Sequence, residues 1–296
     1  MIESRRSRVM TKALIHAVMI LFSLVCVVPL IAVASVSLSS ERSIKLDGYS
    51  LIPFHLDTAA YRYIFRSPWG IIRSYGITFA MTATGTFLSL LVISLLAFPL
   101  SRPDYRYRNK VSFYVFFTML FNGGLVPWYI LIVRYLQLKN HFLVLVLPYL
   151  VIPWFVLLLR TFFKQLPMSL FESAKIDGAS EFRSFFQILL PLSKPALATI
   201  GLFICLNYWN DWWLALLYID EERLVPLQYM LYRMMSNITF LTSQMSTTAV
   251  TIDLSTFPNE SARMAMCVLA AGPMLFIFPF FQKYFVRGLT AGSLKG

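Results

Sequence analysis

The stretch ESAKIDGASEFRSFFQILLP, residues 172–191, places five charged side chains in the middle of an otherwise apolar chain. The chain has 296 residues, of which 58% are hydrophobic and 14% are charged. Soluble domains carry roughly 25% charged residues, so this composition favours lipid as the surroundings of most of the chain. The charged stretch is therefore expected to lie outside the membrane.

The long uncharged runs predict membrane-spanning helices. Five of them contain between 19 and 28 residues, near or above the roughly 18 that indicate a spanning helix. These runs are 13–40, 74–101, 111–133, 140–159 and 264–282. A sixth run, 195–210, is interrupted by Asp211 before an apolar segment continues to Tyr218. We therefore predict an all-α, polytopic membrane protein with six transmembrane helices.

Two other uncharged features have a separate interpretation. The first run contains Ala32-Val33-Ala34, which resembles a signal-peptidase site. It is longer than the apolar core of about 7–15 residues in a cleaved signal sequence, so we expect it to be retained as the first helix. The run 234–252 is rich in Ser, Thr, Asn and Gln and is predicted to lie outside the membrane.

The positions of Lys and Arg predict the orientation, because these residues are enriched on the cytoplasmic side of a membrane protein. With six spans, both termini and the stretch 172–191 share one side. That side carries 16 of the 26 basic residues and five of the 14 acidic residues. The other side carries ten basic and nine acidic residues. Both termini are therefore predicted to be cytoplasmic, and the net charge of +12 requires no nucleic-acid partner.

The third predicted span contains FNGGLVPWY at 121–129. Gly123, Gly124 and Pro127 are expected to interrupt its helical hydrogen bonds. One interpretation is a kink that eases helix packing. The other is a broken helix along a transport route, because interrupted spans recur at substrate sites. Asn122 and the two glycines are therefore candidates for a substrate pathway.

The charged stretch and the residues before it predict two short helices joined by a turn. Pro167 suits a first helical turn, and Leu170, Phe171 and Ala174 share one apolar helix face. Gly178 suits the left-handed position that ends a helix. The pattern alone is compatible with an interfacial helix or with a helix that docks on a protein.

The polar residues of the stretch favour docking on a protein. An interfacial helix usually carries Lys and Arg on its polar face, whereas this one carries Glu172 and Asp177 as well as Lys175. Ser180 is a suitable N-cap for the second helix, and Glu181 is favourably placed against the dipole of that helix.

The same stretch resembles the EAA motif of ABC importer permeases, whose pattern is EAA, three residues, Gly, nine residues, Ile, one residue and Leu-Pro. The matching positions are Glu172, Ala174, Gly178, Ile188, Leu190 and Pro191. Ser173 departs from the motif and replaces its second residue with another small one.

The resemblance extends along nearly the whole chain. YWNDWWLALLY at 208–218 resembles the segment of this family that combines Trp, Asn and an acid, and GLTAGSLKG at 288–296 is similar to the tail of MalG-type sugar permeases. FNGGLVPWYI resembles the branch that handles complex or uronic-acid oligosaccharides, including alginate and pectin fragments. The chain is identified as a member of the MalG-like family of type I ABC importer permeases.

The resemblance implies a division into three parts. Residues 1–12 would be a cytoplasmic segment, residues 13–286 the permease domain with a coupling loop at 161–194, and residues 287–296 a cytoplasmic tail. The loop would insert into a cleft of an ATPase subunit, so that ATP-driven closure produces alternating access. The implied coupling residues are Glu172, Ser173, Ala174, Asp177, Gly178 and Pro191. The tail residues implied to contact the ATPase are Gly288, Thr290, Gly292 and Lys295, and an idle, disordered tail is the alternative.

The implied partners are a second homologous permease, two ATPase subunits, an extracytoplasmic solute-binding protein and an oligosaccharide, in a bacterial cell membrane. The sequence contains no G-x-x-x-x-G-K-[ST] phosphate loop. We therefore expect a transport subunit that is not itself an enzyme and holds no cofactor. ATP and Mg²⁺ would be bound by the partner ATPase.

Asp211 is a further candidate because an acid within a span is costly and usually functional. A structural role near the outer end of the span is the alternative. The aromatic and amide residues around it suit a sugar, whose apolar faces stack on rings and whose hydroxyls bond to amides; a membrane-interface belt also explains the aromatics. These residues are Asn207, Tyr208, Trp209, Asn210, Trp212 and Trp213.

Four other functions are alternatives, one of which is a passive membrane scaffold. The substrate of the importer is either a uronate-containing or a neutral oligosaccharide, and the ten outer basic residues do not discriminate between them. An ion-coupled secondary transporter has no obvious need for the EAA stretch. A membrane-embedded enzyme is disfavoured because His16, His55 and His141 are scattered, with no HExxH or GxSxG motif.

Overall fold

The computed structural model describes residues 5–53, 55–247 and 259–293. Regular structure in these residues is helical, apart from one isolated antiparallel bridge between Ser39 and Leu56. The predicted all-α class is therefore confirmed. The chain divides into two compact units, of which the first contains residues 1–68 and 233–272 and the second contains residues 69–232 and 273–296.

Among the described residues, three helices contain a segment that is long and apolar enough to cross a membrane by itself. They are α1 (Arg5–Ser37), α4 (Pro68–Ser101) and α14 (Glu260–Ser293). Three bent pairs of helices pass the same test as single spans, with bends of 111°, 50° and 82°. By length and composition, the described residues therefore contain up to six spans, the number predicted.

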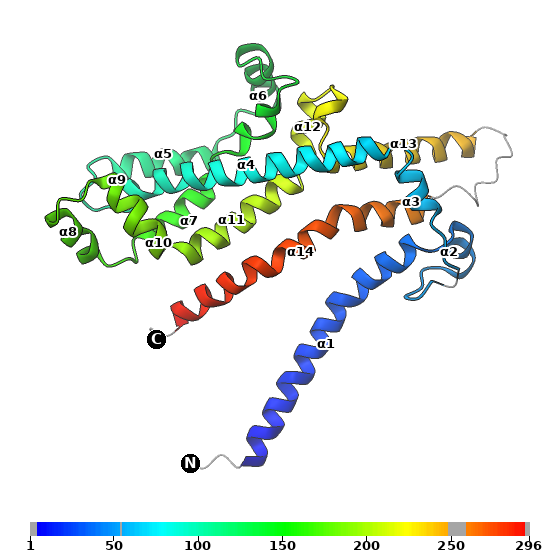
Figure 1. Cartoon of the computed structure of the whole chain (residues 1–296), viewed down its shortest axis with the longest axis horizontal. Helices are drawn as coiled ribbons and strands as arrows, with labels where there is room; N and C mark the ends of the chain where they lie inside the picture. The colour runs from blue at the N-terminus through cyan, green and yellow to red at the C-terminus, as the bar shows by residue number, and fades with distance from the viewer. Residues whose placement is uncertain (1–4, 54, 248–258, 294–296) are drawn as a thin grey trace. The chain divides into compact units, whose positions relative to one another are not determined.

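The second unit contains most of the helices, and Figure 1 shows α8 and α9 at the end of α4 where Ser101 lies. Its further α-helices are α5 (Arg108–Leu120), α6 (Leu125–Ile130), α7 (Pro153–Phe163), α8 (Met168–Ile176), α9 (Glu181–Arg183), α10 (Leu190–Leu192), α11 (Lys194–Trp209) and α12 (Trp213–Tyr218). Residues Leu131–Tyr135 and Ser184–Leu189 are π-helical, and Phe142–Leu145, Leu147–Tyr149 and Glu222–Leu224 form 3₁₀ turns. Helix α13 (Leu227–Thr247) begins in this unit and continues into the first.

The third predicted span is broken and not merely kinked. Helix α5 ends at Leu120, α6 begins at Leu125, and the two parts of the span meet at 111°. Gly124 has a φ of 86°, which only glycine adopts easily, and its N–H donates to Asn122 Oδ1 at 2.9 Å. Pro127 lies in the first turn of α6, where its missing N–H removes no intrahelical bond. The left-handed glycine, and not the proline, therefore marks the break.

The fifth predicted span is also interrupted. Helix α11 ends at Trp209, and α12 begins at Trp213 after a short turn. The apolar run that continues to Tyr218 is therefore a separate helix and not an extension of α11. Helix α13 covers much of the run predicted to lie outside the membrane, and it does not qualify as a span.

The first unit joins α2 (Glu41–Asp47) to the start of α14 through one carboxylate. Glu41 is only 5% exposed. It accepts hydrogen bonds from the backbone N–H groups of Asn259, Glu260 and Ser261 at 3.1–3.3 Å and from the Ser261 hydroxyl at 3.1 Å. These N–H groups lie at the helix start and lack intrahelical acceptors. An acid here also interacts favourably with the helix dipole. Helix α3 (Ala59–Ile64) completes the short helices of this unit.

We predict that Glu41→Ala lowers the stability of the first unit, because three backbone donors and one hydroxyl lose a buried acceptor. The expected loss is roughly 1–3 kcal/mol, measured as a lower Tm of the purified protein in detergent. Asp47→Ala is the matched control, because Asp47 is an exposed acid on the same helix. Equal Tm values for the two variants would contradict the assignment of Glu41 as the cap of α14.

Candidate functional site

The predicted helix, glycine turn and second helix of the charged stretch are confirmed. Helix α8 ends in a Schellman motif, in which Ala179 N donates to Ala174 O at 2.8 Å and Gly178 N donates to Lys175 O at 3.1 Å. Gly178 has a φ of 78°, and no atom lies within 4 Å of the position that a Cβ would occupy. Glycine is therefore required here by the backbone conformation and not by crowding.

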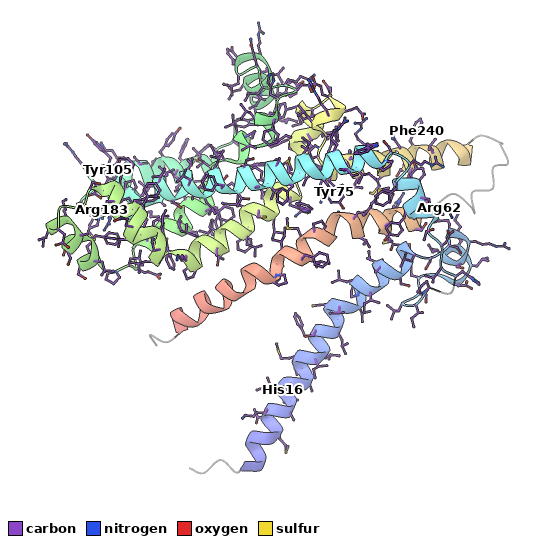
Figure 2. The ribbon with its side chains drawn as sticks, viewed as in Figure 1. His16, Arg62, Tyr75, Tyr105, Arg183 and Phe240 are labelled. Carbon is purple, nitrogen blue, oxygen red and sulfur yellow. The ribbon has the colours of Figure 1, made fainter. Side chains whose placement is uncertain are left out.

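The second helix begins as predicted and leads into the membrane segment. Ser180 Oγ accepts from Arg183 N at 3.2 Å and caps α9. The chain then continues through the π-helical residues Ser184–Leu189 and through α10 into α11. Tyr105 and Arg183 lie at the end of the second unit that contains α8 and α9 (Figure 2).

The structure exposes most of the candidate coupling residues. Glu172, Ser173, Asp177, Gly178 and Pro191 are exposed, as are the apolar side chains of Ile176 and Phe182. The sixth candidate, Ala174, is only 8% exposed and faces the interior of the protein. A surface that mixes charged and large apolar side chains is typical of an interaction site.

The opposite face of α8 attaches to the end of α4. Phe171 is buried, and the ring centroid of Phe98 lies 6.3 Å from that of Phe171 and 5.6 Å from that of Phe185. The Arg102 guanidinium lies 3.5 Å from the Phe171 ring centroid and 4.7 Å from that of Phe98. Its Nη1 atom donates to Met168 Sδ at 3.2 Å. Sequence reasoning missed Arg102 because nothing in the EAA stretch marks a residue 70 positions upstream of Glu172.

Asp211 has a clear structural function. Its side chain is buried, with 7% exposure. One carboxylate oxygen accepts from Tyr149 Oη at 3.2 Å, and the other accepts from Leu214 N at 3.3 Å. The carboxylate therefore satisfies a backbone donor at the start of α12 and connects this helix to the turn that precedes α7. These contacts favour the structural alternative for Asp211.

Tyr208 is a buried connection between three segments. Its hydroxyl donates to the Val146 carbonyl at 2.8 Å and lies 3.2 Å from Ser89 Oγ. Its ring packs directly against Gly85 of α4, where a Cβ would lie 2.5–2.7 Å from ring carbons. Of its neighbours in the candidate segment, Trp209 is also buried, at 2% exposure. Both aromatic residues therefore belong to the packed interior.

The amides of the same segment are exposed. Asn207 and Asn210 reach the surface, as does Trp213. Asn210 Nδ2 donates to Leu206 O at 2.8 Å, and Asn210 Oδ1 accepts from Gln228 Nε2 at 3.4 Å.

Next to these amides, the indole of Trp212 stacks on the ring of Tyr232, with centroids 4.6 Å apart and planes 18° from parallel. Sequence reasoning missed Gln228 and Tyr232, because no motif marks them and only the fold places the start of α13 beside this segment. Asn122, Gly123 and Gly124 lie in the exposed turn between α5 and α6.

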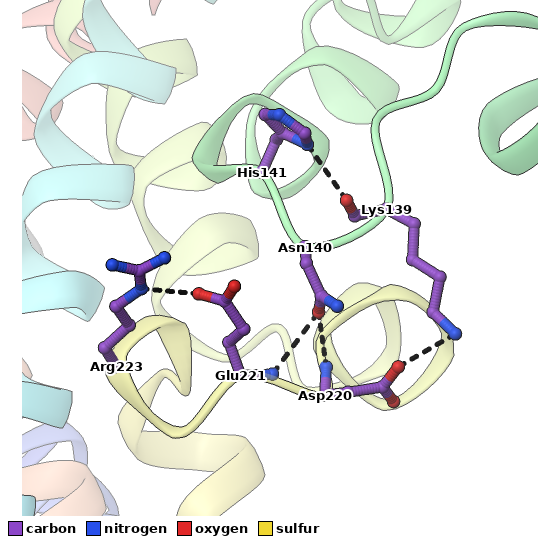
Figure 3. Close-up of polar contacts among 6 residues, drawn as sticks. All are labelled: Lys139, Asn140, His141, Asp220, Glu221 and Arg223. Atoms are coloured by element: carbon purple, nitrogen blue, oxygen red, sulfur yellow. Dashed lines mark hydrogen bonds and ion pairs between the residues drawn. The ribbon is translucent and has the colours of Figure 1, made fainter.

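A polar clamp joins the loop before the fourth span to the loop after α12 (Figure 3). Asn140 Oδ1 accepts from the backbone N–H groups of Asp220 at 2.6 Å and Glu221 at 3.3 Å. Lys139 pairs with Asp220 at 2.8 Å, which raises the pKa of the lysine. Arg223 pairs with Glu221 and lowers the pKa of that acid. The clamp therefore pairs two of the ten basic residues predicted on the outer side with acids, and Arg62 is a third, paired with Asp57 at 3.4 Å.

The tail residues are described only in part. The backbone of Gly288, Thr290 and Gly292 continues α14, which ends at Ser293. Lys295 lies outside the described residues. The helix therefore extends into the region predicted as a separate tail at 287–296.

The succession of apolar and broken helices, with a polar loop between two of them, defines a multi-pass membrane protein. The sequence belongs to the family of binding-protein-dependent transport system inner membrane components, which it matches over residues 58–291. The protein is therefore a permease subunit of an ABC importer, a transport component and not a catalytic one.

Individual relatives match over almost their whole length. The polygalacturonan/rhamnogalacturonan transport system permease protein YtcP of Bacillus subtilis is 38% identical, over 96% of this chain and 97% of that protein. The trehalose/maltose transport system permease protein MalG of Thermococcus litoralis is 28% identical, over 98% and 99%. A crystal structure of a bacterial ABC transporter involved in the import of the acidic polysaccharide alginate contains a chain that superposes with a TM-score of 0.78, at 28% identity, over 96% of this chain and 99% of that one.

We predict that Gly85→Ala destabilises the protein, because the new methyl group displaces the Tyr208 ring and weakens its bond to the Val146 carbonyl. Overpacking of this kind costs roughly 1–3 kcal/mol. Gly76→Ala is the control on the same helix, since no atom lies within 4 Å of its added Cβ. The Tm of the purified protein in detergent is the measurement. A Gly85→Ala variant as stable as Gly76→Ala would show that the close contact with Tyr208 is not required.

Proposed function

We propose that this permease subunit moves uronic-acid-containing oligosaccharides into the cytoplasm. The observation that carries the proposal is the agreement between two similar proteins. The similar Bacillus protein is named for polygalacturonan and rhamnogalacturonan, and the similar solved structure belongs to an importer of the acidic polysaccharide alginate. Neutral oligosaccharides are the second candidate, supported by the likeness to a trehalose and maltose permease.

The proposed importer contains this chain, a second homologous permease, two ATPase subunits that bind ATP and Mg²⁺, and an extracytoplasmic solute-binding protein. Both termini and α8 face the cytoplasm. The exposed residues Glu172 and Ser173 of α8, with Asp177 directly after the helix, contact an ATPase subunit. The tail at 287–296 approaches the ATPase dimer. Alternating access then results from movement of α8 as the ATPases close on ATP.

The proposed sugar contacts lie around Asn210. Its amide, the Gln228 amide and the stacked Trp212 and Tyr232 rings place hydrogen-bonding groups beside aromatic faces. This combination suits an oligosaccharide, which presents hydroxyls and apolar C–H faces together. Asn207 and Trp213 are exposed in the same segment and extend this surface.

Two arginines are the proposed partners of the uronate carboxylates in this chain. Arg73 of α4 and Arg134 of the π-helical turn are exposed, and neither has a hydrogen-bond or ion-pair partner among the described residues. The buried faces of their elements pack together, because Met81 and Ile132 belong to one apolar cluster. An arginine that lacks an internal acid remains available for a bidentate contact with a carboxylate.

The substrate class is tested with the full complex, reconstituted with its binding protein in lipid vesicles. ATP hydrolysis is measured with oligogalacturonates, alginate oligosaccharides and malto-oligosaccharides. We expect stimulation by one or both acidic series and none by the neutral series. Stimulation by the neutral series alone would retain the importer and reject the uronate. An assembled complex that none of the sugars stimulates would reject the sugar assignment.

We predict that Asn210→Ala reduces substrate uptake, because the substrate loses a hydrogen-bond partner worth roughly 0.5–1.5 kcal/mol, or about two- to tenfold in affinity. Assembly is expected to remain normal, since Asn210 is exposed. Trp209→Ala is the contrasting variant. Its side chain is buried, so its removal is expected to lower stability by about 3–5 kcal/mol. Unchanged uptake by an assembled Asn210→Ala complex would remove Asn210 from the substrate pathway.

We predict that substitutions of Gly178 uncouple ATP hydrolysis from uptake. Val is expected to have the largest effect, Ala a smaller one and Asn the smallest. The left-handed conformation costs an L-residue roughly 1–2 kcal/mol, and Asn tolerates it best. Open space around Gly178 excludes a clash between the new side chain and other parts of the protein, so the effect comes from the backbone conformation alone. The measurement is ATP hydrolysed per sugar transported, at equal amounts of assembled complex. Val and Asn variants with the same ratio would contradict a requirement for the left-handed turn.

A further inference from the structure

Arg102 occupies the junction between α8 and α4. Its guanidinium covers the Phe171 ring of α8 at 3.5 Å and the Phe98 ring of α4 at 4.7 Å. It also donates to the sulfur of Met168, the first residue of α8. The Arg102 side chain therefore contacts both α8 of the charged loop and α4, the longest helix of the second unit.

Few groups other than Arg102 and the two rings fill the space where α8 contacts α4. Two cavities of ≈ 400 and ≈ 440 Å³ adjoin it, and Arg102, Asp104 and Glu181 line both. Phe182 lines the first cavity, and Met168 lines the second. Because open volume flanks the stack, the attachment of α8 to α4 depends strongly on the few groups at its centre.

The electrostatic surroundings keep the Arg102 side chain in place. Burial lowers the pKa of its guanidinium, whereas the nearby charges of Glu181 and Asp104 oppose this shift. The group remains protonated, since arginine does not lose its proton in proteins. A half-buried cation that packs on two aromatic rings and donates to the Met168 sulfur has few alternative positions, so it behaves as a fixed contact.

Helix α4 extends from this junction to the Tyr208 connection. Arg160 Nε donates to the Leu100 carbonyl at 3.0 Å and secures the last turn of the helix. Ser89, which lies 3.2 Å from Tyr208 Oη, precedes Phe98 by nine residues, or roughly 14 Å along the helix axis. A displacement applied at Phe98 therefore reaches the segment that precedes Asn210 through a continuous helix.

We propose that Arg102 is the positioning residue that transmits movement of α8 to α4. The proposal rests on the proposed function, in which an ATPase subunit displaces α8. Arg102 contacts neither ATP nor sugar, and it acts by holding Phe171 against Phe98. Loss of Arg102 leaves α8 able to bind the ATPase but unable to move α4 with it. Stimulation of ATP hydrolysis by the loaded binding protein is then lost, whereas basal hydrolysis remains.

The functional test compares Arg102→Ala, Arg102→Lys and Phe171→Leu with Arg106→Ala as the matched control. Arg106 is an exposed cation of the same loop, with its guanidinium 5.7 Å from the Tyr107 ring. We expect Arg102→Ala and Phe171→Leu to reduce the stimulation of ATP hydrolysis roughly 2- to 30-fold, the range found for residues that carry coupling. Arg102→Lys should be intermediate, because lysine keeps the charge and lacks the planar fork. Arg106→Ala should equal the wild type.

A second readout does not depend on transport. A nitroxide is placed at Ile176, which is 87% exposed on α8, or at Tyr135, which is 75% exposed in the distant π-helical turn. For labelling, the three native cysteines are replaced by alanine. The mobility of the label is measured in the complex without nucleotide. We expect Arg102→Ala to increase the mobility of the label at Ile176 and to leave the label at Tyr135 unchanged.

The outcomes separate the two proposals. A wild-type complex that sugars do not stimulate would overturn the proposed function, and the label at Ile176 would still test the attachment by Arg102. If Arg102→Ala and Phe171→Leu show the same stimulation of ATP hydrolysis and the same label mobility as the wild type, the role of Arg102 is overturned. If Arg102→Ala fails to assemble, Phe171→Leu decides by the same readouts. Equal mobility increases at Ile176 and Tyr135 would indicate general loosening and would also overturn the proposal.

Discussion

In lipid, a backbone N–H or C=O group without a partner in the protein costs several kcal/mol, so each interruption of a spanning helix needs local compensation. This chain interrupts its helices repeatedly, and polar groups satisfy the exposed ends. The Asn122 amide bonds to Gly124 N at the break of the third span. Asp211 accepts from Leu214 N after α11, and Glu41 accepts from three donors at the start of α14. Buried and polar side chains near the spans are thus explained by backbone geometry before any role in transport is considered.

Helix α4 is the longest uninterrupted helix in the second unit, and this continuity decides how the unit can move. At one end it contacts α8 through Phe98 and the residue after the helix, Arg102. Nearer the other end, Gly85 admits the Tyr208 ring and Thr78 accepts from Leu227 N at the start of α13. The interrupted helices therefore attach to the continuous helix α4. Local changes at the breaks can thus reach one another through α4.

Local chemistry explains which features were predictable from the sequence. The length of the uncharged runs indicated the spans, because bilayer thickness sets that length directly. The turn at Gly178 was predictable because a left-handed position admits few residue types. The break at Gly124 was also predictable from its glycine. The effect of Pro127 was not predictable, since it depends on where α6 begins. Each of these signals lies within a few residues of the feature that it predicts.

Features that depend on contacts between distant residues left no local signal. Tyr208 and Asn210 are two positions apart, yet one is fully buried and the other exposed, because the surroundings of α11 differ from one side to the other. Gly85 has ordinary helical surroundings in the sequence, and only the Tyr208 ring explains why it is glycine. Arg102 looks like one of several arginines in a basic loop until the fold places Phe171 against it.

Ion pairs inside the protein limit which cations can recognise an acidic substrate. Ten outer basic residues were equivalent in the sequence, but Lys139 and Arg223 are held by Asp220 and Glu221 in the clamp between two loops. A cation paired inside the protein contributes to its architecture, and replacing its acid with a substrate carboxylate would gain little. Recognition of a uronate therefore requires cations that folding leaves unpaired, and Arg73 and Arg134 meet that condition among the described residues of the second unit, which also contains Asn210. Within the second unit, the fold thus limits the acidic-sugar hypothesis to two positions, on α4 and on the π-helical turn, whose buried residues Met81 and Ile132 share an apolar cluster.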